Sequence, residues 1–162
     1  MTTGANPDPE PVAEREIIAA RVLSAPRDLV FQAFSDPRHL AQWWGPNGFT
    51  NTFSEFDLRP GGHWRFVMHG PDGTDYPNHS VFDEVIAPER IVFRHLDAMH
   101  EFQMTILFAD QDGKTRITWR MLHPTVEKCD RVRSFVIEAN EQNFDKLEAE
   151  LSKMNAAKHP ID

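Results

Sequence analysis

The strongest constraint on the fold is a change of periodicity along the chain. From residue 49 to residue 123, apolar and polar side chains alternate with a period of two, which is typical of strands with one buried face. Six strands are predicted, and they cover residues 50–58, 62–70, 79–86, 89–96, 101–109 and 114–122. Short turn sequences rich in Gly, Pro and Asp separate them, so neighbouring strands should form hairpins in an antiparallel sheet.

The flanking segments predict a seventh strand and three helices. Residues 15–23 are rich in β-branched and apolar residues, which favours a strand. Residues 24–34 and 35–44 show helical spacing, and each segment has a proline near its start. A third helix is expected from about Val126 to Met154, and its roughly 28 residues at 1.5 Å each would cross the whole sheet.

This order of elements predicts a single α+β domain over residues 14–156, with the arrangement β-α-α-β6-α. Only the last helix is long enough to cover the apolar face of a seven-stranded antiparallel sheet. The chain has 162 residues, of which 40% are hydrophobic, so it can bury a core of this size. Residues 1–13 lack the basic and apolar regions of a signal peptide and are expected to be a disordered tail.

Charge and composition exclude several classes of partner. The formal net charge of −8 disfavours binding to nucleic acid or to an anionic membrane surface. No apolar run approaches the roughly 18 residues that a transmembrane helix needs. The single cysteine, Cys129, cannot form an internal disulfide, which fits a reducing compartment. Together these observations predict a cytoplasmic protein.

Four stretches of the sequence resemble one known family. They are LAQWWGPNGFT (40–50), EFDLRPGGHWRFVMHGPDG (55–73), ERIVFRH (89–95) and NFDKL (143–147). Over about residues 14–154 the chain is similar to the Hsp90-ATPase-activator-like family of the START/Bet v 1-like superfamily. The resemblance implies a helix-grip fold, in which a curved sheet wraps around the last helix and leaves a cavity. It does not imply one activity, because a shared fold does not dictate function.

The chain departs from the family pattern at two points. Where members often carry Gly-Trp in the last helix, this chain has Ala139 and Asn140, which implies a larger and more polar cavity. The eukaryotic co-chaperone of the family also has a separate N-terminal domain that engages Hsp90, and 162 residues leave no room for it. A chaperone partner is therefore less expected than a small-molecule partner.

The inward face of the predicted sheet is rich in aromatic and methionine side chains. Together with residues of the last helix, they either fill a core or line a cavity suited to a flat or greasy ligand, and periodicity alone does not separate the two. The candidate ligand-binding residues are Trp43, Trp44, Trp64, Phe66, Met68, Phe82, Phe93, His95, Met104, Trp119, Met121, Val136, Asn140 and Asn143.

Two pairs in this set, the adjacent tryptophans and the two asparagines of the last helix, have specific expected environments. Trp43 and Trp44 are adjacent in a helix and so point about 100° apart. We expect Trp43 to enter the core and Trp44 to lie at the rim of the cavity, near Pro46. Asn140 and Asn143 interrupt the apolar stripe of the last helix, and burying an unpaired amide costs about 1–3 kcal/mol. Each amide therefore needs a partner, which is a strand, a buried water or a ligand.

Signals for catalysis or metal binding are weak. The 8 histidines show none of the spacings that zinc sites use, and neither a metal nor a cofactor is expected. His95, and with less support His79, should face the cavity, and His95 is the first candidate for an acid–base role. Glu84 shares the face of Phe82 and would point inward unless a bulge shifts the register.

The sequence thus predicts non-catalytic binding of a small hydrophobic or aromatic molecule in a central cavity. Two alternatives stay open: a cofactor-free enzyme of cyclase or hydrolase type in the same cavity, and a protein-interaction module that engages a chaperone through the outer sheet. A homodimer is compatible with each of the three. If side chains fill the space between sheet and helix, only a scaffold role remains.

Overall fold

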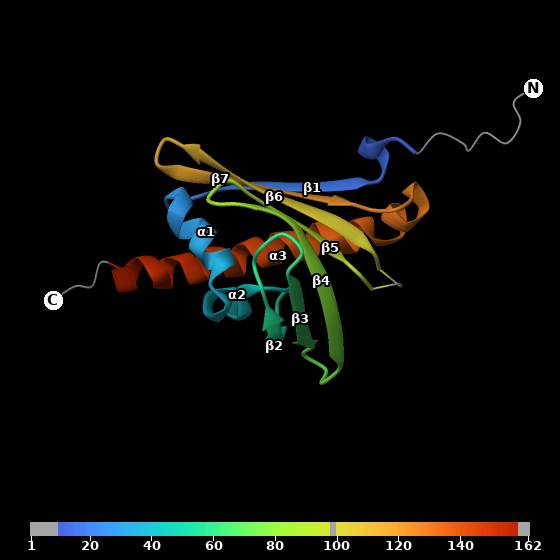
Figure 1. Ribbon diagram of the computed structural model, residues 1–162, viewed down its shortest axis with the longest axis horizontal. Helices are drawn as coiled ribbons and strands as arrows, with labels where there is room; N and C mark the ends of the chain where they lie inside the picture. The colour runs from blue at the N-terminus through green and yellow to red at the C-terminus, as the bar shows by residue number, and fades with distance from the viewer. Residues whose placement is uncertain (1–9, 98–99, 159–162) are drawn as a thin grey trace, which may run out of the picture.

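The computed structural model describes residues 10–97 and 100–158. A seven-stranded antiparallel sheet curves around one long helix, which confirms the predicted order of elements (Figure 1). The strands are β1 (Glu16–Leu23), β2 (Thr50–Phe56), β3 (His63–His69), β4 (Asp75–Ile86), β5 (Arg90–His95), β6 (Phe102–Gln111) and β7 (Lys114–Leu122). The helices are α1 (Arg27–Ser35), α2 (Pro37–Trp43) and α3 (Val126–Lys158), preceded by the 3-10 helix η1 (Val12–Glu14).

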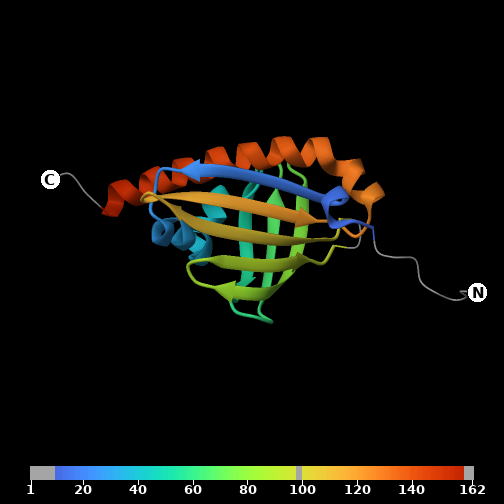
Figure 2. The ribbon, with the colours of Figure 1, turned by 90° about the horizontal axis from the view of Figure 1, so that it is seen from above.

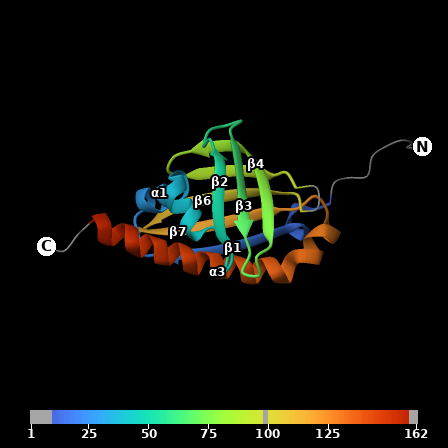
Figure 3. The ribbon, with the colours of Figure 1, turned by 90° about the horizontal axis from the view of Figure 1, so that it is seen from below.

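The sheet is a continuous meander from β2 to β7, and β1 joins it beside β7. The spatial order is β1-β7-β6-β5-β4-β3-β2, and every neighbouring pair is antiparallel. Seen from above, α3 runs alongside β1 (Figure 2). Seen from below, β2, β3 and β4 run across the direction of β1 and β7, so the sheet folds around a concave face (Figure 3).

The predicted alternation decides which side chains face inward. In β7, Ile117, Trp119 and Met121 are buried, whereas Arg116 and Arg120 are exposed. Successive side chains of a strand point to opposite faces of the sheet, so this pattern places the apolar set on the concave side.

Two β-bulges change the alternation where the sheet bends. The bulge between Phe53 and Glu55 in β2 lets Phe53 and Phe56 both pack against the core, although the parity of their positions differs. The bulge between Phe82 and Glu84 in β4 turns the Glu84 carboxylate to the surface, where it lies 3.7 Å from the guanidinium of Arg90. Glu84 therefore does not enter the cavity.

β4 begins at Asp75, whereas the sequence predicted a turn for residues 75–78. The prediction was wrong at this point, since Asp75 pairs with His69 and Pro77 pairs with Val67 of β3. β5 pairs with β4 only from Ser80 onward, so Pro77 lies in a segment with a neighbouring strand on one side. A proline without an N–H is tolerated in such an edge segment.

The two short helices connect β1 to β2 and cover one end of the concave face. In α1, Leu29, Val30 and Phe34 are buried. The side chain of Asp36 accepts a hydrogen bond from the backbone N–H of Arg38 and so caps the first turn of α2. A proline at the first helical position fits this turn, because its missing N–H would have no partner there.

α3 spans 33 residues and packs its apolar stripe against the sheet. Phe144 and Leu147 are fully buried in its middle. On the edge near β1, the guanidinium of Arg21 contacts three carboxylates of α3 at 2.8 to 3.2 Å, those of Glu141, Asp145 and Glu148. Within the described ranges no helix, α3 included, is both long and apolar enough to cross a membrane.

The N-terminal segment predicted to be disordered falls only partly within the described residues. Residues 1–9 lie outside them, and of residues 10–13, which are all exposed, Glu10 has hydrogen bonds to the domain. The side chain of Glu10 accepts a hydrogen bond from the backbone N–H of Val126 at 3.3 Å, and its carbonyl accepts one from Arg15 at 3.0 Å. The start of α3 is therefore linked to the residues before β1.

Candidate functional site

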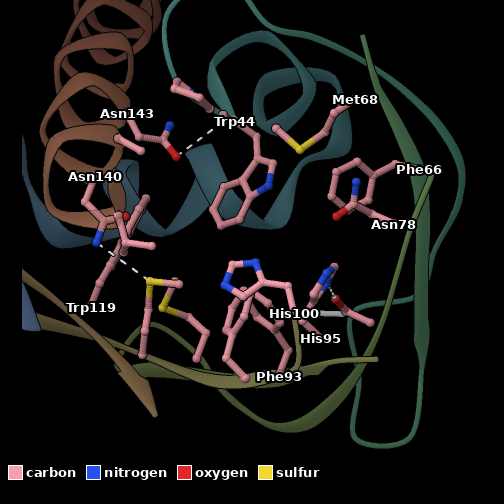
Figure 4. A pocket seen from close by; sticks show the side chains of 18 of the residues that line it. Trp44, Phe66, Met68, Asn78, Phe93, His95, His100, Trp119, Asn140 and Asn143 are labelled. Carbon is pink, nitrogen blue, oxygen red and sulfur yellow. Dashed lines mark hydrogen bonds between the residues drawn. The ribbon is translucent and has the colours of Figure 1, made fainter. Parts of the chain in front are cut away.

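A cavity of about 170 Å³ lies between the concave face of the sheet and α3 (Figure 4). Its wall comes from α3, from the segment that follows α2 and from strands β3 to β7. The predicted site residues that line it are Trp44, Trp64, Phe66, Met68, Phe93, His95, Met104, Trp119, Met121, Val136, Asn140 and Asn143. The aromatic and thioether side chains therefore leave part of the space unfilled.

Two predicted site residues lie elsewhere. Trp43 is 1% exposed and belongs to the core, where its indole N–H donates to the carbonyl of Ala33 at 3.0 Å. Phe82 stacks on Trp64 with 6.1 Å between ring centres and lines a separate hollow of about 10 Å³. Such a hollow is about the size of one water molecule, so Phe82 contributes to packing.

Several lining residues were not among the predicted ones. They are Gly45, Pro46, Asn78, Ser80, His100, Phe102, Phe135 and Ala139. Ser80 is two residues before Phe82 on the same face of β4, so the alternation contained a signal for it. Phe135 is 68% exposed and marks the place where the cavity reaches the surface, and the apolar stripe of α3 gave no signal for it.

Trp44 is one of the side chains that line the cavity, and it lies deeper than the predicted position at the rim. Its ring centre is 5.1 Å from that of Trp64, 5.5 Å from that of Trp119 and 6.2 Å from that of Phe93. It is half-buried, and its indole projects from the segment after α2 toward the middle of the cavity (Figure 4). Of the two adjacent indoles, one thus fills the core and the other faces the cavity.

The segment that carries Trp44 is fastened to α3 by the amide of Asn143. The Asn143 side chain donates to the carbonyl of Trp43 at 2.8 Å and accepts from the N–H of Gly45 at 3.2 Å. Gln142 accepts from the N–H of Asn47 at 3.1 Å. The predicted need of Asn143 for a partner is therefore met within the protein.

Lys146 strengthens the same attachment. Its ammonium donates to the carbonyls of Gly45, Pro46 and Phe49 at 3.2 to 3.3 Å. Burial lowers the pKa of Lys146, because a charged ammonium loses hydration there. Three convergent carbonyls replace part of that hydration and keep the loop against the helix.

Asn140 is the polar side chain of the cavity that has the weakest partner. It is 6% exposed, and its amide N–H₂ lies 3.7 Å from the sulfur of Met121 (Figure 4). A thioether is a weak acceptor, so most of the hydrogen-bonding capacity of this donor is unused. The predicted need of Asn140 for a partner is therefore not met by a strong acceptor of the protein.

Two indole N–H groups of the cavity wall lack an acceptor in the described part of the chain. They belong to Trp64, which is 2% exposed, and to Trp119, which is 1% exposed. Buried indole N–H groups usually have a partner. The wall therefore combines a mostly apolar surface with buried donors.

His95 faces the cavity as predicted, and it is neutral at physiological pH. It is 7% exposed, and burial lowers its pKa to about 4. Its Nδ1 lies 3.5 Å from the hydroxyl of Ser80, and its ring stacks on Phe102 at 5.0 Å. His79 instead points to the outer face, where its ring nitrogen lies 2.7 Å from that of His63.

None of the described residues that line the cavity carries a formal charge at neutral pH. His95 and His100 are the titratable members, and burial lowers the pKa of both. Across the described ranges, no group of three or more His, Cys, Asp or Glu side chains is placed to hold a metal ion. The cavity can therefore solvate neutral polar atoms but offers no counter-charge to an ion.

Comparison with solved structures places this arrangement among known folds. A crystal structure of a Mycobacterium smegmatis protein is similar at 27% identity with a TM-score of 0.79, covering 89% of this chain and 95% of that one. A solution structure from Arthrobacter aurescens has 23% identity and a TM-score of 0.81, covering 89% and 90%. An AHSA1 protein from Silicibacter pomeroyi has 22% identity and a TM-score of 0.70, covering 86% and 99%.

Comparison at the sequence level identifies the family. No curated protein matches the chain. The model of the family described as "Activator of Hsp90 ATPase homolog 1-like protein" matches residues 24–152, from the end of β1 to the last turns of α3. That range includes all the lining residues of the cavity. The chain therefore belongs to this AHSA1-like family of the START/Bet v 1-like superfamily.

Proposed function

We propose that this protein binds a small hydrophobic or aromatic molecule in the central cavity without transforming it. The observation that carries the proposal is the unfilled volume of about 170 Å³ among buried aromatic and methionine side chains. Empty apolar space costs stability, because its lining atoms lose dispersion contacts. A ligand that restores those contacts would therefore bind favourably.

The volume bounds the size of the ligand. An engineered apolar cavity of about 150 Å³ is large enough for benzene. A cavity of about 170 Å³ suits a single ring with a small substituent. The exposed Phe135 lies at the opening, so a ligand can enter beside α3.

The chemistry of the wall favours binding over catalysis. A general base works best with a pKa near the operating pH, whereas burial lowers the pKa of His95 to about 4. The contact of His95 with the Ser80 hydroxyl is long at 3.5 Å, and no carboxylate among the described lining residues orients the ring. These features support a receptor more than a cofactor-free enzyme.

Thermal unfolding with toluene as the probe tests the proposal. Toluene at ten times its Kd should stabilise the fold by about 1.4 kcal/mol, which raises Tm by roughly 3 to 6 °C for a chain of this size. Asn140→Trp should fill the cavity and abolish the shift, and Ala139→Leu offers a smaller obstruction. Glu138→Trp places an indole on the exposed side of α3 and is the control that should retain the shift.

The proposal fails if toluene gives no saturable shift in the unmodified protein. It also fails if the folded Asn140→Trp and Ala139→Leu variants respond as strongly as Glu138→Trp. Folding of each variant is checked by circular dichroism before the ligand is added. Consumption of a bound ligand over time, measured by chromatography, would favour the enzymatic alternative.

A further inference from the structure

The cavity wall holds side-chain donors that lack a strong acceptor, beside the Nε2 of His100, which donates or accepts according to its tautomer. An indole N–H can only donate, and those of Trp64 and Trp119 have no acceptor in the described residues. The Asn140 N–H₂ reaches only the Met121 sulfur, at 3.7 Å. The other amide of α3 at the cavity, that of Asn143, is hydrogen-bonded to the backbone through both its nitrogen and its oxygen. A molecule that brings an acceptor therefore complements the weakly paired donor of Asn140.

The electrostatics of the cavity favour a neutral acceptor. The lining contains two titratable side chains, His95 and His100, and burial lowers the pKa of both. An ion buried without a counter-charge loses several kcal/mol of hydration. A neutral carbonyl oxygen accepts hydrogen bonds without that cost, whereas burying a carboxylate incurs it.

The aromatic lining and the volume of the cavity favour a small aromatic ring. The Trp44 indole projects into it from the loop side, and Phe93 and His95 lie across from it on the sheet (Figure 4). The Trp44 and Phe93 ring centres lie 6.2 Å apart with their planes at 64°, so a bound ring would contact these aromatic side chains edge-to-face or face-on rather than lie between them. The volume of about 170 Å³ limits that molecule to one ring and a short substituent.

We propose that the cavity takes neutral aryl carbonyl compounds with a single ring, such as aryl ketones, aldehydes or esters, and that Asn140 donates a hydrogen bond to the carbonyl oxygen. The residue is 6% exposed, so the hydrogen bond would form away from bulk water, where it is stronger. This inference rests on the proposed binding function and adds to it the chemical class of the ligand.

The test compares acetophenone with α-methylstyrene, in which a CH₂ group replaces the carbonyl oxygen at nearly the same shape. Their affinities are measured by calorimetry for the full chain and for Asn140→Leu, which removes the donor at similar volume. The ratio of the two affinities cancels general effects of the substitution on the cavity. Asn140→Leu should lower the preference for acetophenone by about five- to tenfold. Asn155→Leu, on the exposed side of α3, should leave the ratio unchanged.

A spectroscopic measurement keeps the inference testable if Asn140→Leu does not fold. The infrared carbonyl stretch of ¹³C-labelled acetophenone should move to lower frequency in the unmodified protein than in an apolar solvent. Absence of that shift in a bound ligand overturns the inference. Tighter binding of benzoate than of acetophenone at neutral pH overturns the conclusion that the cavity takes a neutral ligand.

The outcomes separate this inference from the proposed function. If both probes bind and the affinity ratio is the same in Asn140→Leu, the ligand class is wrong and apolar binding stands. If α-methylstyrene binds and acetophenone does not, the same conclusion holds. If neither probe nor toluene binds, the proposed function itself is wrong.

Discussion

At the residue scale, polar side chains of α3 decide where the cavity wall lies. Asn143 and Lys146 hold the backbone after α2, so that the Trp44 indole stays in the cavity. Asn140, three residues before Asn143, is left with a weak thioether contact. Residues of the same helix face thus divide between those that hold the wall and one whose donor has only a weak partner in the protein.

Replacing Lys146 by Met should loosen the loop that carries Trp44. The substitution keeps the length of the side chain but leaves three carbonyls without their donor. We expect a loss of about 1 to 2 kcal/mol in the free energy of unfolding, because these groups are only half-buried and water partly replaces the donor. Urea denaturation measures the loss.

Lys153→Met is the matched control for this substitution, since Lys153 lies on the exposed face of α3. It should change the stability by less than about 0.5 kcal/mol. Equal stability of the two variants would show that the Lys146 contacts do not hold the loop. Trp44 fluorescence in the Lys146→Met variant should also become more accessible to acrylamide.

At the scale of elements, the Gly45-Pro46 turn after α2 positions the cavity wall. Gly45 has a φ of +100°, a conformation that residues with a Cβ rarely adopt. A Cβ atom at this position would also lie 2.7 Å from the terminal methyl of Met68, which lines the cavity. The turn therefore depends on glycine both for its backbone shape and for its contact with β3.

Gly45→Ala should destabilise the protein more than Gly73→Ala. Both glycines have positive φ, but a Cβ atom at Gly73 meets no atom within 4 Å. Backbone strain alone costs about 1 to 2 kcal/mol, so Gly73→Ala measures that strain without the clash. Gly45→Ala should lose slightly more in chemical denaturation, because the terminal methyl of Met68 must move, and the added loss stays small since that methyl is the flexible end of its side chain. An equal loss in both variants would show that Met68 adapts freely.

At the scale of the whole molecule, the fold buries histidines around one end of the cavity. His95, His100 and His123 lie near Phe102, and burial lowers the pKa of all three. The unfolded chain binds these protons more readily than the folded one. Their contribution to stability is therefore complete above about pH 6.5 and decreases below it, and for His95 the loss continues until the pH reaches about 4.

His95→Gln should make the stability less sensitive to acid. The pKa of His95 is lowered to about 4, first by burial and then by His100 and His79, while Asp97 opposes the shift. Between pH 7.5 and 4.5 this residue should account for roughly 2 to 3 kcal/mol of lost stability in the unmodified protein. Urea denaturation at the two pH values measures the difference.

The variant His69→Gln, on the outer face of the sheet, is the control for a change in histidine content. The same pH dependence in His95→Gln and in the unmodified protein would show that His95 is not protonated on acid unfolding. The comparison between variants removes the contribution of carboxylates, which also titrate in this range.

The sequence by itself determined the order of elements, the inward face of most strands and a majority of the residues around the cavity. These properties follow from local periodicity, because a period of two residues in a strand or 3.6 residues in a helix determines which side chains share a face. The stretch around Trp43 and Trp44 also carried the family resemblance. Periodicity alone did not place Glu84, because the bulge in β4 adds a residue and one inserted residue inverts the face of all that follow.

Only the tertiary structure decided that the space is partly empty, and which aromatic side chains border it. Trp43 and Phe82 were as apolar and as well placed in the pattern as Trp44, yet they fill the core. Lys146 followed the pattern of a solvated residue, but three loop carbonyls come within reach of it. Volume and hydrogen bonding depend on distances between elements far apart in the chain, and no local pattern encodes those distances.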